Sequence, residues 1–313
     1  MPAESDFIAS LRAFASDPAA RGLMDDAAVL EVGGTRLVLT HDMIAEGVHF
    51  LSDDPPRDVA WKLLAVNLSD LAAKGARPVG ALMGYTIGDT DWDRAFAQGL
   101  ERATAALGCP LMGGDTVSGP ARVLGLTAIG EALGGVPSRA GAKAGDLLWV
   151  TGSIGDAGAG LKILRGDLKG AADLVERYRL PRPRLEAGQA LAPLVSAMMD
   201  VSDGLMIDGA RMAEASGLAL EIEIGSIPLS ASYIAALGED RQARLAAATA
   251  GDDYELLFAT AEEAAPEILT LSEQLGLSLS RIGRFNPGVG IRLTEGGEDV
   301  PLPQSLGYEH RRA

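Results

Sequence analysis

The chain has little positive charge, one cysteine and few histidines. Its 313 residues contain 27 Lys+Arg against 43 Asp+Glu, which gives a net charge of -16. This deficit argues against a nucleic-acid-binding protein, because such binding depends on neutralising phosphates with Lys and Arg. Cys109 alone cannot form an intramolecular disulfide, which fits a reducing compartment. His41, His49 and His310 are too scattered for a paired-histidine zinc site.

Long apolar runs and several enzyme signatures are also missing. No segment approaches the roughly 18 uninterrupted apolar residues of a membrane span, and the first residues lack the pattern of a secretory signal. We therefore expect a cytoplasmic protein. The nucleophile elbow of α/β-hydrolases, the P-loop and the protein-kinase motifs do not occur. Any phosphoryl transfer by this chain would depend on metal ions and positioning, which carry most of such catalysis in general.

Aspartates set among small residues are frequent instead. They occur at Asp25–Asp26, Asp42, Asp70, Asp115, Asp156, Asp200–Asp203 and Asp252–Asp253. Several of them border apolar runs, where an unpaired carboxylate would be costly to bury. Mg²⁺ prefers oxygen ligands of this kind and usually shares them with substrate phosphates. Any one motif is also explained by a solvated surface, but together they predict a multi-metal phosphate site and a phosphoryl-transfer reaction.

Strand and helix patterns alternate along the chain, which predicts an α/β (or α+β) fold in two domains. Gly33–Gly34 predicts a hairpin turn, and Pro56–Lys74 predicts a helix with Asn67, Asp70 and Lys74 on one stripe. We expect residues 113–116 in a loop and a strand over 252–259. The turn at 152–158 suits a phosphate cradle or a plain strand-to-helix connection equally well. A glycine-rich connection at 134–143 predicts the boundary between domains 1–137 and 138–313.

Five runs, in this order and spacing, resemble the thiamine-monophosphate kinase family. They are Glu46–Phe50, Ala65–Ala72, Gly113–Thr116, Asp200–Leu205 and Asp252–Leu256. The resemblance extends from Asp25 to the C-terminal Gly307–His310. It implies the two-domain aminoimidazole-ribonucleotide-synthetase-like fold, in which N-terminal domains pair in a homodimer and ATP lies between the domains. It also implies the ATP-dependent phosphorylation of thiamine monophosphate to thiamine diphosphate, with several Mg²⁺ ions.

The resemblance assigns roles to particular residues of this chain. As ligands of the Mg²⁺ ions it implies Asp26, Thr40, His41, Asp42, Asp70, Asp115, Asp200 and Asp203, with His41 acting through its backbone. For ATP it implies Gly114, Asp115, Arg139 and Ser202, and for thiamine monophosphate His49, Asp252 and Tyr308. No side chain is expected to act as a general base, so catalysis would be metal-assisted through Asp42, Asp70 and Asp115. Domain 1–137 would bind ATP and Mg²⁺ and dimerise, and domain 138–313 would complete the nucleotide and substrate site.

Three departures from the family pattern and two alternative functions qualify this interpretation. Met24, His41 and Asp252 stand where the family usually has glycine, a hydroxyl residue and glutamate. Selenophosphate synthetase and the hydrogenase-maturation dehydratase would need reactive cysteines that the sequence lacks. An enzyme similar to aminoimidazole ribonucleotide synthetase, and a non-catalytic protein that binds nucleotide or divalent cations, remain as alternatives.

Overall fold

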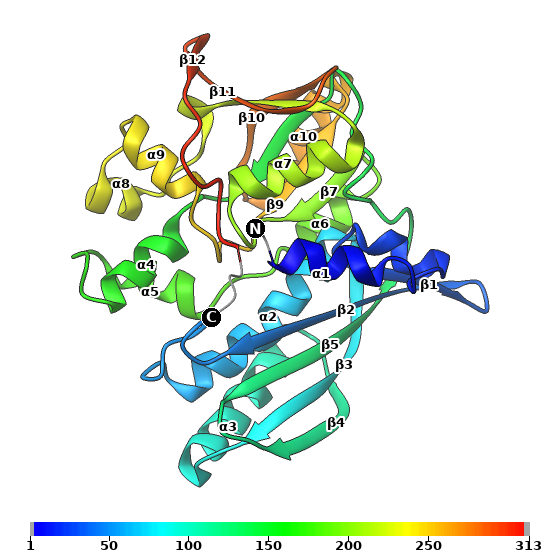
Figure 1. Ribbon diagram of the computed structural model, residues 1–313, viewed down its shortest axis with the longest axis vertical. Helices are drawn as coiled ribbons and strands as arrows, with labels where there is room; N and C mark the ends of the chain where they lie inside the picture. Colours follow the sequence, from blue (N-terminus) through cyan, green and yellow to red (C-terminus); the bar gives the residue numbers. More distant parts are fainter. Residues whose placement is uncertain (1–2, 310–313) are drawn as a thin grey trace.

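The computed structural model describes residues 3–309, so His310 lies outside the described range. The described chain folds into two halves, each built around its own β-sheet (Figure 1). Between residues 3 and 309, no helix has both the length and the apolar character that crossing a membrane requires. The expected alternation of strands and helices is confirmed in both halves.

The N-terminal sheet has five strands in the order β1-β2-β5-β3-β4. These are β1 (Ala28–Val32), β2 (Thr35–Ala45), β3 (Ala76–Ile87), β4 (Leu111–Ser118) and β5 (Val123–Ala132). The predicted hairpin is confirmed, because β1 and β2 pair antiparallel with Val32 opposite Thr35. All neighbouring strands are antiparallel except β3 and β4, which run parallel.

The prediction that residues 113–116 form a loop is wrong. They lie inside β4, where Gly114 pairs with Met83 and Asp115 with Gly84. Two adjacent glycines disfavour a strand by propensity, but here a close backbone approach requires them. A Cβ atom on Gly114 would lie 1.9 Å from the Met83 carbonyl oxygen. Pairing with β3 therefore overrides the local preference.

Helices cover one face of the N-terminal sheet. Helices α2 (Pro56–Ala73) and α3 (Thr90–Ala106) pack there and bury an apolar cluster that includes Leu63, Phe96 and Leu126. Several large apolar side chains elsewhere on β2, β3 and β4 are more than a third exposed, namely Met43, Val79, Leu82, Met112 and Val117. Helix α1 (Ala3–Leu11) and a 3-10 helix, η1 (Pro18–Leu23), precede the sheet.

The C-terminal sheet has seven strands in the order β12-β11-β8-β10-β6-β9-β7. These are β6 (Leu147–Thr151), β7 (Ala197–Asp200), β8 (Ala219–Glu223), β9 (Leu256–Thr260), β10 (Leu279–Asn286), β11 (Gly290–Glu295) and β12 (Glu298–Val300). The helices are α4 (Asp156–Leu164), α5 (Ala172–Arg179), α6 (Leu185–Leu191), α7 (Leu205–Ser216), α8 (Ala231–Leu237), α9 (Arg241–Ala248) and α10 (Ala265–Leu275), with 3-10 turns η2 (Ile224–Ser226) and η3 (Glu262–Ala264).

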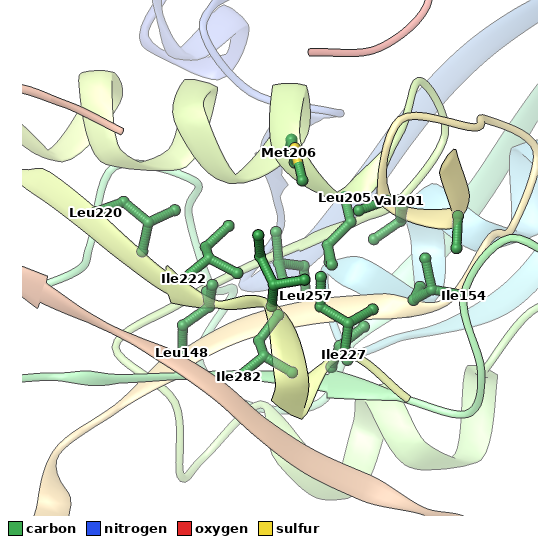
Figure 2. Packing of buried hydrophobic residues seen from close by; sticks show 14 of the residues in the cluster. Leu148, Ile154, Val201, Leu205, Met206, Leu220, Ile222, Ile227, Leu257 and Ile282 are labelled. Carbon is green, nitrogen blue, oxygen red and sulfur yellow. The ribbon is translucent and has the colours of Figure 1, made fainter. Parts of the chain in front are cut away.

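Both faces of this sheet are buried at its centre, which explains the continuous apolar runs of β6, β7 and β9. Figure 2 shows Leu148, Leu257 and Ile282 of the sheet packed with Leu205 and Met206 at the start of α7. The neighbouring residues of the same strands point the other way and pack against α6 and α10.

The strand predicted over residues 252–259 begins only at Leu256. Residues 251–255 are irregular, and Asp252 and Tyr254 have φ angles of 70° and 50°. Non-glycine residues seldom adopt such angles, because the side chain then crowds the backbone. The aspartate motif before β9 is therefore a shaped loop and not part of the sheet.

Helix α2 lies between the two halves (Figure 1). It is buried from Val59 to Ala73 except at Trp61, because the N-terminal sheet covers one side of it and β7 and α6 approach the other. Such a helix is apolar nearly all round, as expected for one enclosed on every side. The polar side chains of its buried part, Lys62, Asn67, Ser69 and Asp70, consequently lie inside the protein.

Candidate functional site: an acidic cluster between two cavities

Three of the predicted metal ligands converge where the two halves meet. One carboxylate oxygen from each of Asp26, Asp70 and Asp200 lies within 4.8 Å of the other two. Asp26 precedes β1, Asp70 is on α2, and Asp200 ends β7. Ser69 of α2 donates a 2.6 Å hydrogen bond to Asp200 Oδ2, which ties the two halves together at this point.

Strand β2 adds Thr40 and Asp42 to this cluster. The Thr40 hydroxyl donates to Asp70 Oδ2, and the Asp42 backbone N–H donates to Asn67 Oδ1 at 2.9 Å. Successive strand residues point to opposite faces, so His41 faces away from the cluster. Its imidazole is exposed, and Nδ1 lies 2.8 Å from the Thr127 hydroxyl on β5. Among these predicted ligands, His41 could therefore reach a metal only through its backbone.

Cationic side chains neutralise one end of the cluster. Lys74 is fully buried, and its Nζ lies 2.5 Å from Asp25 Oδ1 and 2.7 Å from Asp26 Oδ2. Arg21 pairs with Asp25 at 2.6 Å, and Arg139 pairs with Asp26. Burial alone would raise the pKa of Asp25, but the charge and hydrogen bonds of Lys74 and Arg21 lower it to about 2. Lys74 and Arg139 likewise outweigh burial and lower the pKa of Asp26.

At the other end of the cluster the carboxylates have raised pKa values. No Lys or Arg between residues 3 and 309 forms an ion pair with Asp42, Asp70 or Asp200. Burial, followed by the charges of Asp26 and Asp203, raises the pKa of Asp42 to about 6. Burial also raises the pKa of Asp70 and Asp200 well above the ordinary value, with neighbouring carboxylates adding to the effect.

This donor set fits Mg²⁺. Mg²⁺ takes oxygen ligands and keeps several waters or phosphate oxygens, and the cluster offers several buried carboxylates that lack a protein cation. Mutual repulsion among such groups is relieved when a divalent ion binds between them. Asp26, Asp42, Asp70, Asp200 and Asp203 all line cavity A, and the Thr40 hydroxyl bonds to Asp70.

The loop after β7 is held by Asp208, which sequence reasoning missed. Asp208 Oδ2 accepts backbone hydrogen bonds from Ser202, Asp203 and Gly204 at 3.0–3.1 Å. Burial, followed by the charge of Asp203, raises the pKa of Asp208 to about 6. Arg211 lies 2.5 Å from Asp203 and 2.9 Å from Asp208. An aspartate in the first turn of a helix was the available signal, since a carboxylate there suits free N–H groups.

Two cavities meet at this loop. The first, cavity A, has a volume of about 660 Å³ and is lined by residues that include Met24, Asp25, Asp26, Asp70, Arg139, Asp200, Arg211 and Glu214. The second, cavity B, has a volume of about 540 Å³ and is lined by residues that include His49, Lys162, Arg165, Asp252, Tyr254 and Tyr308. Asp42, Ser202 and Asp203 line both. Of the predicted ATP contacts, Arg139 lines cavity A and Ser202 lines both cavities, whereas the predicted acceptor contacts line cavity B.

The residues of cavity B include all three predicted substrate contacts. His49 Nδ1 accepts a 3.1 Å hydrogen bond from the Ala45 backbone, so the neutral ring carries its proton on Nε2. Gly158, from the glycine-rich turn, lies on the cavity wall at the first turn of α4. Lys162 and Arg165 are exposed lining residues that sequence reasoning did not single out.

Asp115 and Gly114 do not join the cluster in a single chain. They lie on the outer strand β4, which two strands separate from β2. Neighbouring strands are about 4.8 Å apart, so β4 with Asp115 lies roughly 14 Å from β2, the strand that carries Asp42. Both residues are exposed, and neither lines cavity A or cavity B.

Comparisons with known proteins place this architecture in a family. Residues 24–132 match the N-terminal domain of AIR synthase related proteins, and residues 143–295 match the C-terminal domain. A thiamine-monophosphate kinase from Caulobacter vibrioides is 40% identical over 99% of this chain and 91% of its own length. The chain belongs to the thiamine-monophosphate kinase family. The resemblance and the two-domain fold that the motifs predicted are thereby confirmed.

Solved structures of the kinase family agree with this fold. AaThiL complexed with AMPPCP and TMP has a TM-score of 0.84 and 28% identity, covering 97% of this chain and 96% of its own. The kinase from Stenotrophomonas maltophilia K279a has a TM-score of 0.78 and 36% identity, covering 94% of this chain and 96% of its own. The match extends over both halves and therefore over both cavities.

The structure accounts for two of the departures from the kinase family pattern. Met24 has φ -118° and ψ 7°, so no glycine is required at this position. Its side chain lines cavity A. Asp252 has a positive φ, which aspartate tolerates better than most residues because its short polar side chain can bond locally. The shorter acid therefore suits the loop in this chain.

Proposed function

We propose that this chain transfers the terminal phosphoryl group of ATP to thiamine monophosphate, giving thiamine diphosphate and ADP. The observation that carries the proposal is the meeting of cavities A and B at Asp42, Ser202 and Asp203. A kinase has to bring two phosphates together at one point, with the rest of each ligand in its own pocket. Membership in the kinase family and the binding of AMPPCP and TMP by AaThiL support the same reaction.

Cavity A is proposed to bind ATP. Arg139 and Arg211 lie on its wall, where guanidinium groups suit phosphate oxygens. Among the hydrogen bonds of the described residues, none involves Arg139 Nε, so a buried donor is available to a ligand. We assign ATP and Mg²⁺ binding mainly to domain 1–137, with domain 138–313 completing the site. Buried Cys109 forms no disulfide, which supports a cytoplasmic location.

Cavity B is proposed to bind thiamine monophosphate. The Nε2–H of His49 suits a phosphate oxygen, while Asp252 and Tyr308 offer a carboxylate and an aromatic ring for the heterocycles. The phosphate end of the acceptor would lie at Asp42, and the rings would extend toward Tyr308. Its phosphate has a second pKa of about 6 and is already largely ionised near neutral pH. No protein general base is therefore needed.

Bound Mg²⁺ would supply neutralisation of the phosphate charge and alignment of the reacting oxygens. Asp26, Asp42, Asp70, Asp200 and Asp203 would hold the ions, with Thr40 orienting Asp70. Arg139 and Lys74 fix Asp26 from the outside of the cluster. The role of the polypeptide is thus mostly to hold ligands in place before phosphates arrive.

A direct assay tests the function. The purified protein is incubated with ATP, MgCl₂ and thiamine monophosphate, and thiamine diphosphate and ADP are quantified by chromatography. We expect both products in equal amounts, and only slow phosphorylation of unphosphorylated thiamine, because a free hydroxyl is less ionised than a phosphate. Thiamine turned over as fast as its monophosphate would contradict the proposal. ADP without thiamine diphosphate would indicate another acceptor.

We further propose a homodimer in which Asp115 serves the partner's site. The other face of the N-terminal sheet carries exposed apolar side chains, and β4, which presents Asp115, is the outer strand of the sheet as described over residues 3–309. Pairing of two such sheets would cover the apolar side chains and carry Asp115 and Gly114 across to the other chain's cluster. Sedimentation of the purified protein should give the mass of a dimer.

Mixed dimers test the role of Asp115. Asp70→Asn and Asp115→Asn should each be inactive alone. After subunit exchange, half of the dimers would be mixed, and each of these would have one intact site, so about a quarter of parental turnover should return. If Asp115 acts within its own chain, mixing restores nothing.

A further inference from the structure

Lys62 lies behind the wall of cavity B, in contact with two of its lining residues. It belongs to α2, its side chain is 2% exposed, and it is not itself a lining residue. Nζ donates hydrogen bonds of 2.9 Å to the His49 carbonyl oxygen and to Asp252 Oδ2. It also lies 3.9 Å from the ring centroid of Tyr178. A buried ammonium needs such partners, because an unpaired one is costly to desolvate.

Asp252 is engaged on both carboxylate oxygens. Oδ2 pairs with Lys62, and Oδ1 accepts a 3.1 Å hydrogen bond from the Tyr254 hydroxyl. Its backbone N–H donates to the Ser202 carbonyl oxygen at 2.8 Å. Positive φ angles at Asp252 and Tyr254 persist only where surrounding contacts determine the conformation. The loop is thus held in one shape, with a carboxylate that already has a cation.

This pairing changes what cavity B presents to a ligand. A lone carboxylate attracts a cationic ring with the full Coulomb energy of one charge, whereas a contact ion pair acts as a dipole with a weaker field. A carboxylate next to an aromatic ring would ordinarily suit a cationic heterocycle. In the structure, the wall at Asp252 carries no net charge, because Lys62 comes from the other half of the molecule to cancel it.

We propose that Lys62 is a specificity-determining positioning residue that orients and neutralises Asp252, so that cavity B selects its acceptor by hydrogen bonds and shape and not by ring charge. The inference rests on the proposed function of cavity B. It concerns only acceptor choice, since Lys62 lies outside cavity A and forms no ion pair with the acidic cluster.

Two acceptors of the same shape distinguish this role from a structural one. One is thiamine monophosphate, and the other is its analogue with a neutral thiophene in place of the thiazolium ring. The measured quantity is the ratio of kcat/KM for the cationic acceptor to that for the neutral acceptor. Lys62→Met should raise this ratio at least about tenfold, because it leaves the charge of Asp252 uncancelled. Asp252→Asn should lower the ratio, because it leaves Lys62 uncancelled.

The double variant Lys62→Met/Asp252→Asn is the decisive case. It has neither charge and should return the ratio to within about threefold of the parent. If the charge of Asp252 instead recognises the ring and Lys62 only supports the fold, the double variant keeps the low ratio of Asp252→Asn. That result, or an unchanged ratio in Lys62→Met, overturns the proposal. The double variant leaves no unpaired ion, so it also covers the case in which Lys62→Met does not fold.

Lys74→Met is the matched control, because Lys74 is an equally buried lysine of the chain that pairs with aspartates in cavity A. It should lower turnover with both acceptors and leave their ratio unchanged. Lys62→Arg keeps the charge, and its ratio should stay within about threefold of the parent even if KM rises. The parent is assayed first. No turnover of thiamine monophosphate would refute the proposed function, whereas turnover with an unaltered ratio would refute only the role of Lys62.

Discussion

The carboxylates at the two ends of the acidic cluster are all largely buried, but their pKa values are shifted in opposite directions. Asp25 and Asp26 have lowered pKa values because Lys74, Arg21 and Arg139 surround them. Asp70 and Asp200 have raised pKa values because burial and other carboxylates outweigh their hydrogen bonds. The difference separates carboxylates that Lys and Arg side chains neutralise from carboxylates with which no Lys or Arg of residues 3–309 pairs. We expect the first end to stabilise the metal-free protein and the second to contribute most to the proposed binding of metal ions.

The largest expected effect is at the end without protein cations. Asp70→Asn should lower turnover by at least about a hundredfold, a barrier increase of roughly 2.7 kcal/mol. The metal-free variant should be as stable as the parent or more so, because a repelling carboxylate is gone. Steady-state kinetics and thermal unfolding without Mg²⁺ measure the two quantities. Asp58→Asn, on the same helix outside the cluster, is the control and should keep parental turnover. A folded Asp70→Asn with normal activity would remove Asp70 from the site.

The same substitution at the cation-rich end should act on stability. Asp25→Asn removes a partner from both Lys74 and Arg21, which leaves buried positive charge poorly compensated. We expect the free energy of unfolding to fall by about 2 kcal/mol. Urea denaturation of the metal-free protein gives this value. If Asp25→Asn and Asp70→Asn shift stability equally and in one direction, the two ends do not differ as described.

pH should affect the metal-free and metal-bound protein in opposite ways. The pKa of Asp42 is raised from 3.8 to about 6 in the folded protein. Its contribution to stability is therefore fully present below the unfolded value and is lost as pH rises through the folded one. The metal-free melting temperature should fall between about pH 4 and pH 7 from this contribution. Mg²⁺ needs the ionised carboxylate, so the stabilisation by added MgCl₂ should grow over the same range. A stabilisation by MgCl₂ that does not vary with pH would be inconsistent with titration at Asp42.

The smallest effect is expected at His41, on the far face of β2. His41→Thr should leave activity within a few-fold of the parent at saturating Mg²⁺, because the imidazole contacts Thr127 and not the cluster. An imidazole ligand would instead favour Mn²⁺ or Co²⁺ over Mg²⁺ in the parent. Turnover with each metal, before and after the substitution, measures this. A preference that disappears in His41→Thr would show that the side chain is a ligand.

The sequence predicted the aspartates of the site better than the cations beside them. Asp70 and Asp200 stand out locally, because a carboxylate next to an apolar run needs a reason to be buried. Lys74 was recognised only as a neighbour of Asp70 on the helix, since its pairing with Asp25 depends on how distant segments pack. Lys62 gave no signal at all, because its position follows an ordinary helical pattern.

For the fold as well, the sequence predicted features that depend on local interactions and missed features that depend on distant contacts. Helix α2 and the hairpin were predicted from spacing and turn residues, which act locally. The strand character of Gly113–Thr116 was missed, because it arises from pairing with β3 and not from propensity. The loop before β9 was also missed, because its positive φ angles are imposed by contacts with Val201, Ser202 and Lys62.

Helix α2 constrains how this enzyme could be rebuilt from parts. Three residues of this helix and its C-terminal cap belong to the N-terminal half of the chain but bond to the other half. They are Lys62, Ser69 and Lys74, and their partners are Asp252, Asp200 and Met198, respectively. A chimera joined at the linker between the two domains would separate these residues from the partners they are matched to. Exchange between distant homologues would therefore succeed only if these three residues are transferred together with the C-terminal domain. The C-terminal domain and these three residues of the N-terminal half therefore form one functional unit for such a transfer.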